Sequence, residues 1–209
     1  MSATSQYKLA EQALRIIVGG TPTDDAEVTI QELVIAVSQA FATVVKNQYF
    51  AAKAIGEQMI NGNLIYAFED IEVQSDPNKG LFFSELPSTT INLPYDMGVH
   101  QISRMKDQGR VFIPVQNGFS GLFEGLKSQK LAGRIGYYLE NDRVYYENMT
   151  VTNEVSTVLM KLVVPLSSLD VDDEVNVPDD IQGEIIAGVV QLYSVEQQNP
   201  HDETSDLNK

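Results

Sequence analysis

Hydrophobic residues follow two different spacings along this 209-residue chain. Near both ends they recur every three or four positions, as in an amphipathic helix, whereas between them they tend to alternate with polar residues, as in a half-buried strand. The pattern predicts an α+β protein. Its expected architecture is a long-helix bundle, made of two N-terminal helices and one C-terminal helix, with an inserted antiparallel β-rich domain that is a sandwich or barrel-like.

The spacing also predicts where the parts of the chain begin and end. Residues 1–62 form the N-terminal helical part and residues 63–164 the β-rich insert. Residues 165–196 contain the C-terminal helix, which completes the bundle. Residues 197–209 have no hydrophobic period and are expected to form a flexible acidic tail.

The first and last predicted helices are short. The first covers Ser5–Val18 and ends at Gly19-Gly20, a pair that suits a helix C-terminus. The last begins near Pro178, where the missing amide of proline is harmless in the first turn. Two glycines in this helix, Gly183 and Gly188, would allow the long helix to approach closely. Its predicted buried stripe is Ile181, Ile185, Val189 and Leu192.

A long helical pattern lies between them and begins at Thr29. Thr29 and Glu32 fit a capping box, in which each residue satisfies a backbone amide of the other. The apolar spacing can continue to about Ile60, which gives a helix roughly 48 Å long. A break near Asn47 or Gly56 is the alternative. An unbroken helix would pack on its own chain at one end and on neighbouring molecules elsewhere.

The middle of the chain predicts six to eight short strands. Its clearest signal is a hairpin, in which Arg134–Leu139 and Val144–Tyr146 flank a polar turn. Two tyrosines on each side of this turn are placed to pair across it. The other strands with defined limits are expected at Thr89–Leu93, Val99–Met105, Arg110–Val115 and Val155–Val164.

Negative charge is concentrated near the C-terminus. The chain has a net charge of −15, from 29 acidic residues and 14 lysines and arginines. From Pro165 onward eleven acids accompany one base, which gives −10, while the preceding 164 residues carry −5. So acidic a chain should not hold a nucleic-acid backbone non-specifically. The C-terminal charge therefore solvates the surface, repels DNA or docks on a basic partner.

No motif in the sequence indicates a catalytic or metal centre, so we expect no enzyme activity and no cofactor. There are no cysteines, and the two histidines, His100 and His201, are too far apart in the chain to suggest a zinc motif. The acidic run Asp170–Glu174 fails as an EF-hand, because Val175 and Ile181 stand where glycine and glutamate are required. The polar N-terminal residues and the short charge-free runs predict neither a secretory signal nor a membrane span.

Two stretches of sequence, together with the order of elements, resemble a known family. The first is LVVPLSSLDVDDEVNVPDDIQGEII, residues 162–186. The second is LPYDMGVHQIS, residues 93–103, followed by RVFIPV, residues 110–115. They resemble the head-to-tail adaptor proteins, or connector ring proteins, of tailed bacteriophages, especially those of podovirus-like and crAss-like phages.

The resemblance implies a structural virion protein. Such proteins form a ring, typically of twelve copies, which docks under the portal protein, extends the DNA channel and joins the capsid to the tail. Their helices pack between subunits, and their C-terminal tails commonly reach into the portal. By this resemblance we expect a homo-oligomer, a dodecamer, that is made in the host cytoplasm and resides in the virion neck. It would contact the portal protein and other neck or tail proteins, while DNA passes without specific binding.

Two segments are the expected partner-binding sites. From its position in the chain, the C-terminal tail is expected to contact the portal through Val195, Pro200 and Leu207. Residues 117–130 are rich in glycine and long for a loop in a compact domain, a length that is typical of contact with a partner. The apolar residues of that loop are Phe119, Leu122, Phe123 and Leu126.

Two other classes of function stay open. An acidic DNA mimic, or another protein-binding module that inhibits a nucleic-acid enzyme, would use the same C-terminal charge. An enzyme such as a cell-wall-degrading hydrolase would use two carboxylates, although no feature selects a pair among the 29 acids.

Overall fold

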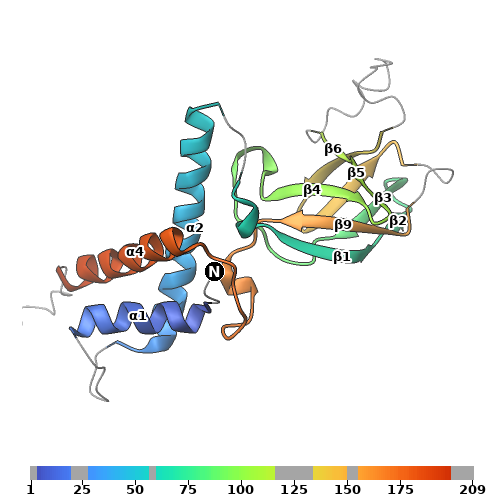
Figure 1. Ribbon diagram of the computed structural model, residues 1–209. Coiled ribbons are helices and arrows are strands. Elements are labelled where there is room, and N and C mark those ends of the chain that lie inside the picture. The colour runs from blue at the N-terminus through green and yellow to red at the C-terminus, as the bar shows by residue number, and fades with distance from the viewer. Residues whose placement is uncertain (1–3, 20–27, 57–59, 116–133, 150–154, 199–209) are drawn as a thin grey trace, which may run out of the picture. The chain divides into compact units, whose positions relative to one another are not determined.

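The computed structural model of this protein describes residues 4–19, 28–56, 60–115, 134–149 and 155–198 (Figure 1). The chain divides into two compact units. The helical unit consists of Met1–Leu64 and Pro165–Lys209, and the β unit consists of Ile65–Val164. The described residues contain three α-helices and two largely antiparallel sheets, which confirms the predicted α+β class.

The three helices of the helical unit contact one another in pairs. They are α1 (Gln6–Val18), α2 (Ile30–Ala54) and α4 (Asp179–Gln198). On α4 the predicted stripe is buried at its first three positions, but Leu192 is 44% exposed. Leu192 lies on the same face as Val189, almost one turn beyond it.

Close approach of the helices explains one of the two glycines singled out in α4. A Cβ atom on Gly188 would lie 3.4 Å from the Cβ atom of Ala40, on α2, so this prediction is confirmed. A Cβ atom on Gly183 would have no neighbour within 4 Å, so the same prediction for Gly183 is wrong. A methyl group at position 188 would already be in close van der Waals contact with Ala40.

The long helix α2 begins as predicted and ends earlier. At its start the backbone amide of Glu32 donates to Thr29 Oγ1 at 3.3 Å, and the amide of Thr29 donates to Glu32 Oε2 at 3.0 Å. These hydrogen bonds lower the pKa of the Glu32 carboxyl group. The extension to Ile60 is wrong: α2 ends at Ala54, and Gly56 follows with φ +82°, a left-handed conformation that suits glycine and stops a helix.

The β unit contains nine strands in its described part, one more than the upper end of the predicted range. One sheet has the order β1-β9-β4-β5 and the other the order β2-β3-β8-β7-β6. All pairings are antiparallel except β6 with β7. The strands are β1 (Tyr66–Glu72), β2 (Gln74–Asp76), β3 (Leu81–Glu85), β4 (Val99–Arg104), β5 (Asp107–Val111), β6 (Ile113–Pro114), β7 (Gly136–Glu140), β8 (Arg143–Glu147) and β9 (Thr157–Leu162).

The predicted tyrosine hairpin is confirmed as β7 and β8. Tyr137 lies opposite Tyr146 and Tyr138 opposite Tyr145, and the rings of the second pair stack with centroids 5.5 Å apart. Asn141, in the turn, has φ +56°, a left-handed conformation that asparagine tolerates better than most residues.

The other strand predictions have mixed outcomes. The strands at Val99–Met105 and Val155–Val164 are confirmed as β4 and β9, and Arg110–Val115 is divided between β5 and β6. The prediction at Thr89–Leu93 is wrong. That segment makes a backbone hydrogen bond from the amide of Ile91 to the carbonyl of Val163 at 2.9 Å, but it lies between Pro87 and Pro94. Because proline has no amide to donate, the ladder does not extend beyond it.

Candidate functional site

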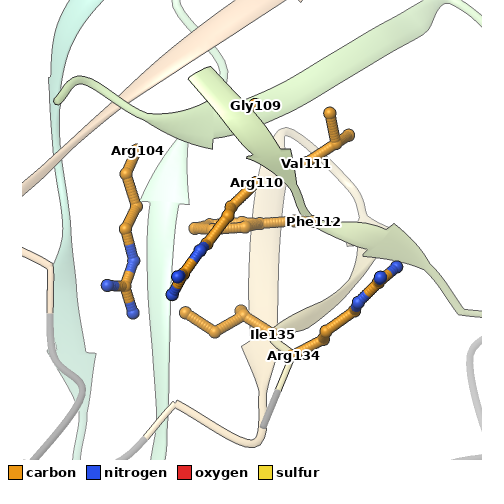
Figure 2. Close-up of a pocket in the computed structure, with 7 residues that line it drawn as sticks. All are labelled: Arg104, Gly109, Arg110, Val111, Phe112, Arg134 and Ile135. Atoms are coloured by element: carbon orange, nitrogen blue, oxygen red, sulfur yellow. The ribbon is translucent and has the colours of Figure 1, made fainter. Parts of the chain in front are cut away.

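A pocket of about 540 Å³ in the β unit is the candidate site (Figure 2). Its lining residues are Arg104, Gly109, Arg110, Val111, Phe112, Arg134 and Ile135. Three of the five arginines of the chain are therefore at one place, in a protein whose net charge is −15. The sequence analysis did not identify this pocket.

Strand pairing brings these residues together from three parts of the chain. Phe112 lies between β5, which belongs to one sheet, and β6, which belongs to the other. Its amide donates to the carbonyl of Ile102 at 2.8 Å, and the amide of Ile113 donates to the carbonyl of Ile135 at 3.0 Å. The chain is thus fixed on both sides at the point where it crosses between the sheets.

The apolar side chains of the pocket belong to the core of the β unit. Phe112 and Ile135 are buried. The Phe112 ring meets the Tyr146 ring edge-on, with centroids 5.7 Å apart and planes at 83°. The Tyr146 hydroxyl donates to Ser84 Oγ at 3.0 Å, and burial raises the pKa of Tyr146. The floor of the pocket is therefore held by close packing and a buried hydrogen bond.

The three arginines supply the charge of the pocket. Figure 2 shows that the Arg104 and Arg110 side chains extend in the same direction, whereas Arg134 extends away from them. The Arg110 side chain is 81% exposed, and its Nε atom lies 3.0 Å from Asp107 Oδ2. Guanidinium groups stay protonated at any physiological pH, and each offers a planar set of donors that matches a carboxylate or a phosphate. The pocket is therefore suited to binding anionic groups beside an apolar surface.

A second charged feature lies in the helical unit and is called the acidic turn, residues 169–174. It follows the short helix η3 (Leu166–Ser168) and exposes four carboxylates. The exposed acids are Asp170, Asp172, Asp173 and Glu174. Between them Val171 is also exposed, at 36%. The turn thus presents an apolar side chain flanked by negative charges.

Hydrogen bonds to the start of α1 hold the backbone within the acidic turn and just after it. The amide of Tyr7 donates to the carbonyl of Val171 at 3.4 Å, and the amide of Val175 donates to the carbonyl of Thr4 at 2.8 Å. Before the turn, the amide of Ser167 donates to Ser38 Oγ at 3.0 Å, from α2. The acidic run that fails as an EF-hand is therefore anchored at several points.

The side chain of Gln6 adds to this anchor. Gln6 is almost fully buried in α1, and its Nε2 atom donates to the carbonyl of Leu166 at 2.5 Å and to the carbonyl of Leu169 at 3.4 Å. A buried glutamine amide on an otherwise apolar helix face requires such partners. Sequence reasoning missed this residue, although a glutamine at the first helical position beside Leu9 and Ala10 is the signal that could have revealed it.

A third surface feature is the C-terminal end of α2, here called the α2 end and defined as residues 50–55. Phe50 is 51% exposed and Ile55 is 74% exposed, and Ala51 and Ala54 between them are exposed as well. Within the helical unit, this end of α2 extends past α1 and α4 (Figure 1). It therefore presents an apolar surface that the described helices α1 and α4 do not cover.

Of the six partner-binding residues predicted from sequence, the described part of the chain includes Val195. Val195 lies within α4, which continues to Gln198, two residues beyond the predicted end of the helical segment. The remaining five residues lie outside the described part of the chain: Pro200, Leu207, Phe119, Leu122 and Phe123. Their predicted roles stay predictions.

His100, the histidine within the described ranges, is partly buried on β4. Its Nδ1 atom is buried without a hydrogen-bond partner, and burial, with the nearby charge of Lys161, lowers its pKa. Across the described ranges, no cluster of three or more potential ligands is placed to hold a metal ion, and no helix is long and apolar enough to cross a membrane. No protein-family model and no curated protein matches this chain.

Proposed function

We propose that the protein is a head-to-tail adaptor of a tailed bacteriophage. In this proposal its copies form a ring under the portal protein, extend the DNA channel and join the capsid to the tail. The resemblance of residues 93–103, 110–115 and 162–186 to such proteins supports it. The finer architecture belongs to the same proposal: the three helices act as one long-helix bundle, and the two sheets act as a sandwich or barrel-like insert.

The observation that carries this proposal is the exposed α2 end. Contiguous exposed apolar side chains on a soluble protein mark a contact surface. The proposed occupant is a neighbouring copy, because the helices of the family that this chain resembles pack between subunits. A phenylalanine side chain buries about 150–250 Å² in total, so the half of Phe50 left exposed offers about 100 Å² to a partner. At about 25 cal/mol per Å² this area stabilises each contact by about 2.5 kcal/mol.

The distribution of charge supports a channel component. The helical unit carries seventeen acids and five bases, hence −12, while the β unit carries twelve acids and nine bases, hence −3. A ring whose helical units are this acidic would present a surface that repels DNA, and it would let a duplex pass without holding it.

The test is the native mass of the protein, alone and with a ring of portal protein. We expect a weakly associating monomer that joins the portal in fixed stoichiometry, twelve copies to a ring. Phe50→Asp should weaken association about 60-fold, the equivalent of the 2.5 kcal/mol estimated above. Asn47→Asp is the matched control, because it adds the same charge to an exposed position on the same helix. A protein that binds neither portal nor any neck protein would contradict the proposal.

One observation favours a second candidate, the acidic DNA mimic that inhibits a nucleic-acid enzyme. All seven acids between residues 170 and 184 are exposed. A series of exposed carboxylates can stand in for the phosphates of a nucleic acid on a basic partner. Tight one-to-one capture of a nuclease, with no portal binding, would favour this candidate over the adaptor.

A further inference from the structure

We propose that the arginine-lined pocket of the β unit binds the acidic turn of another copy of this chain. The proposal deepens the adaptor function and rests on it, because it supplies a contact between neighbouring subunits of the proposed ring. It concerns a surface distinct from the α2 end, so the two contacts can be removed separately.

The chemistry of the pocket selects a short acidic peptide segment. Its cationic side chains extend in two directions, Arg104 and Arg110 one way and Arg134 the other, with the buried Phe112 and Ile135 among them (Figure 2). A ligand that fills it therefore needs more than one carboxylate and an apolar group. A single inorganic anion would use the guanidinium groups and leave the side chain of Val111, which also lines the pocket and is 43% exposed, uncovered. A nucleic-acid strand would bring its further phosphates against a protein of net charge −15.

The acidic turn meets these requirements. Val171 supplies the exposed apolar side chain, and Asp170 and Asp172 stand directly on either side of it in the sequence. Carboxylates are the natural partners of guanidinium groups, with which they form paired, charge-assisted hydrogen bonds. The backbone of the turn is already fixed by its hydrogen bonds to Thr4 and Tyr7. Less conformational entropy is lost when a segment binds in a shape that it already has.

The occupant is a second copy because the two surfaces are complementary in charge and lie in different units of the chain. The pocket is in the less acidic β unit and the turn in the strongly acidic helical unit. A contact between two different surfaces of identical chains is heterologous, and repetition of such a contact generates a closed ring when the rotation between copies closes. This is the type of contact that a connector ring requires.

Charge reversal tests the contact in the full-length protein. Arg110→Glu with Arg134→Glu should weaken self-association at least tenfold, and so should Asp170→Lys with Asp172→Lys. Mixing the two doubly substituted proteins should restore association, because each then offers the partner that the other needs. Lys106→Glu is the matched control, since Lys106 is an exposed base in the turn after β4 that does not line the pocket. Unchanged association in the arginine variant would overturn the proposal.

Disulfide trapping tests the geometry directly, because the chain has no cysteine of its own. Val111→Cys and Val171→Cys are made in separate proteins and then mixed under mild oxidation. A covalent pair of the two different proteins is expected, and any such pair joins two copies by design. Val111→Cys mixed with Ile35→Cys, an exposed position on α2, is the control and should give no such pair. Equal trapping in both mixtures would contradict the assignment.

A peptide assay separates the failure of this contact from the failure of the ring. A labelled synthetic peptide of residues 167–176 should bind the wild-type protein, and the arginine variant should bind it at least tenfold more weakly. If the portal still recruits a full ring of the arginine variant and the peptide does not bind, the pocket proposal is wrong and the adaptor stands. If the peptide binds but the portal recruits no copies of the protein, the pocket proposal stands and the adaptor proposal is wrong. Inorganic phosphate or a single-stranded oligonucleotide that binds more tightly than the peptide at this pocket would also overturn the proposal.

Discussion

Two buried serines of the β unit should respond in opposite ways to the same substitution. Ser84 and Ser103 are both fully buried. Ser84 Oγ donates to the carbonyl of Glu72 at 2.8 Å and accepts from the Tyr146 hydroxyl at 3.0 Å. Ser103 Oγ is buried without a hydrogen-bond partner. The pair therefore isolates the contribution of the hydrogen bonds from that of losing one buried oxygen.

The magnitudes follow from the groups left behind. Ser84→Ala removes two hydrogen bonds. The bond to the Glu72 carbonyl contributes about 1 kcal/mol, and loss of the bond from Tyr146 leaves its buried hydroxyl without an acceptor, which costs about 1–3 kcal/mol. Together these effects should lower the free energy of unfolding by about 2–4 kcal/mol. Ser103→Ala removes a buried polar group that has no partner, so it should leave stability unchanged or raise it by about 1 kcal/mol.

Urea denaturation followed by tyrosine circular dichroism measures the difference, because the chain has nine tyrosines and no tryptophan. With a slope of about 2 kcal/mol per M, Ser84→Ala should lower the midpoint by about 1–2 M. In a Tyr146→Phe background the same substitution should cost only about 1 kcal/mol, since no hydroxyl is then stranded. Equal effects of the two serine substitutions would refute this account of the packing beneath the pocket.

Two further predictions concern the anchor of the acidic turn and the partly buried histidine. Gln6→Leu should destabilise the helical unit by about 1 kcal/mol, since the carbonyl of Leu166 keeps its bond from the Leu169 amide, and hydrogen exchange near the turn should quicken. The lowered pKa of His100 means that the unfolded chain binds its proton more readily than the folded chain. Stability should therefore be complete above about pH 6.5 and fall as pH drops below it. The wild-type denaturation midpoint should be lower at about pH 5.5 than at about pH 7.5, and His100→Gln should reduce that difference by the share that comes from His100. An identical pH dependence in His100→Gln would refute the second prediction.

The helices could be predicted where local chemistry fixes them. The capping pair Thr29 and Glu32 starts α2, and Gly19, with φ +72°, ends α1. The apolar spacing predicted Leu192 to be buried with the stripe of α4, but its side chain is 44% exposed. The length of a neighbouring helix is a property of tertiary structure, which periodicity within one helix does not contain.

Strand pairing limited the prediction in the β unit. The tyrosine hairpin was predictable because its two strands are joined by a short turn and pair locally. At Thr89–Leu93 the β-forming residues favoured a strand, but the flanking prolines interrupt the backbone pairing on either side.

The pocket could not be predicted because its residues share neither a period nor a local motif. Arg104, Arg110 and Arg134 meet because β5 pairs with β4 and β6 pairs with β7, and such long-range register is not visible in a single sequence. One signal was available: three of the five arginines of a very acidic chain fall within 31 consecutive residues, 104–134.

The two proposed contacts between copies have different physical origins, and salt should therefore separate them. The α2 end is apolar, so its contribution does not depend on the charge of either partner. The pocket and the acidic turn attract one another through exposed charges, which are screened over about 8 Å at physiological ionic strength and over about 3 Å at 1 M. High salt should thus weaken the pocket contact while it also relieves the repulsion between molecules of net charge −15. Self-association that rests on the α2 end would persist or strengthen in high salt. The greater affinity of the wild-type protein over the variant with Arg110→Glu and Arg134→Glu would disappear at high salt.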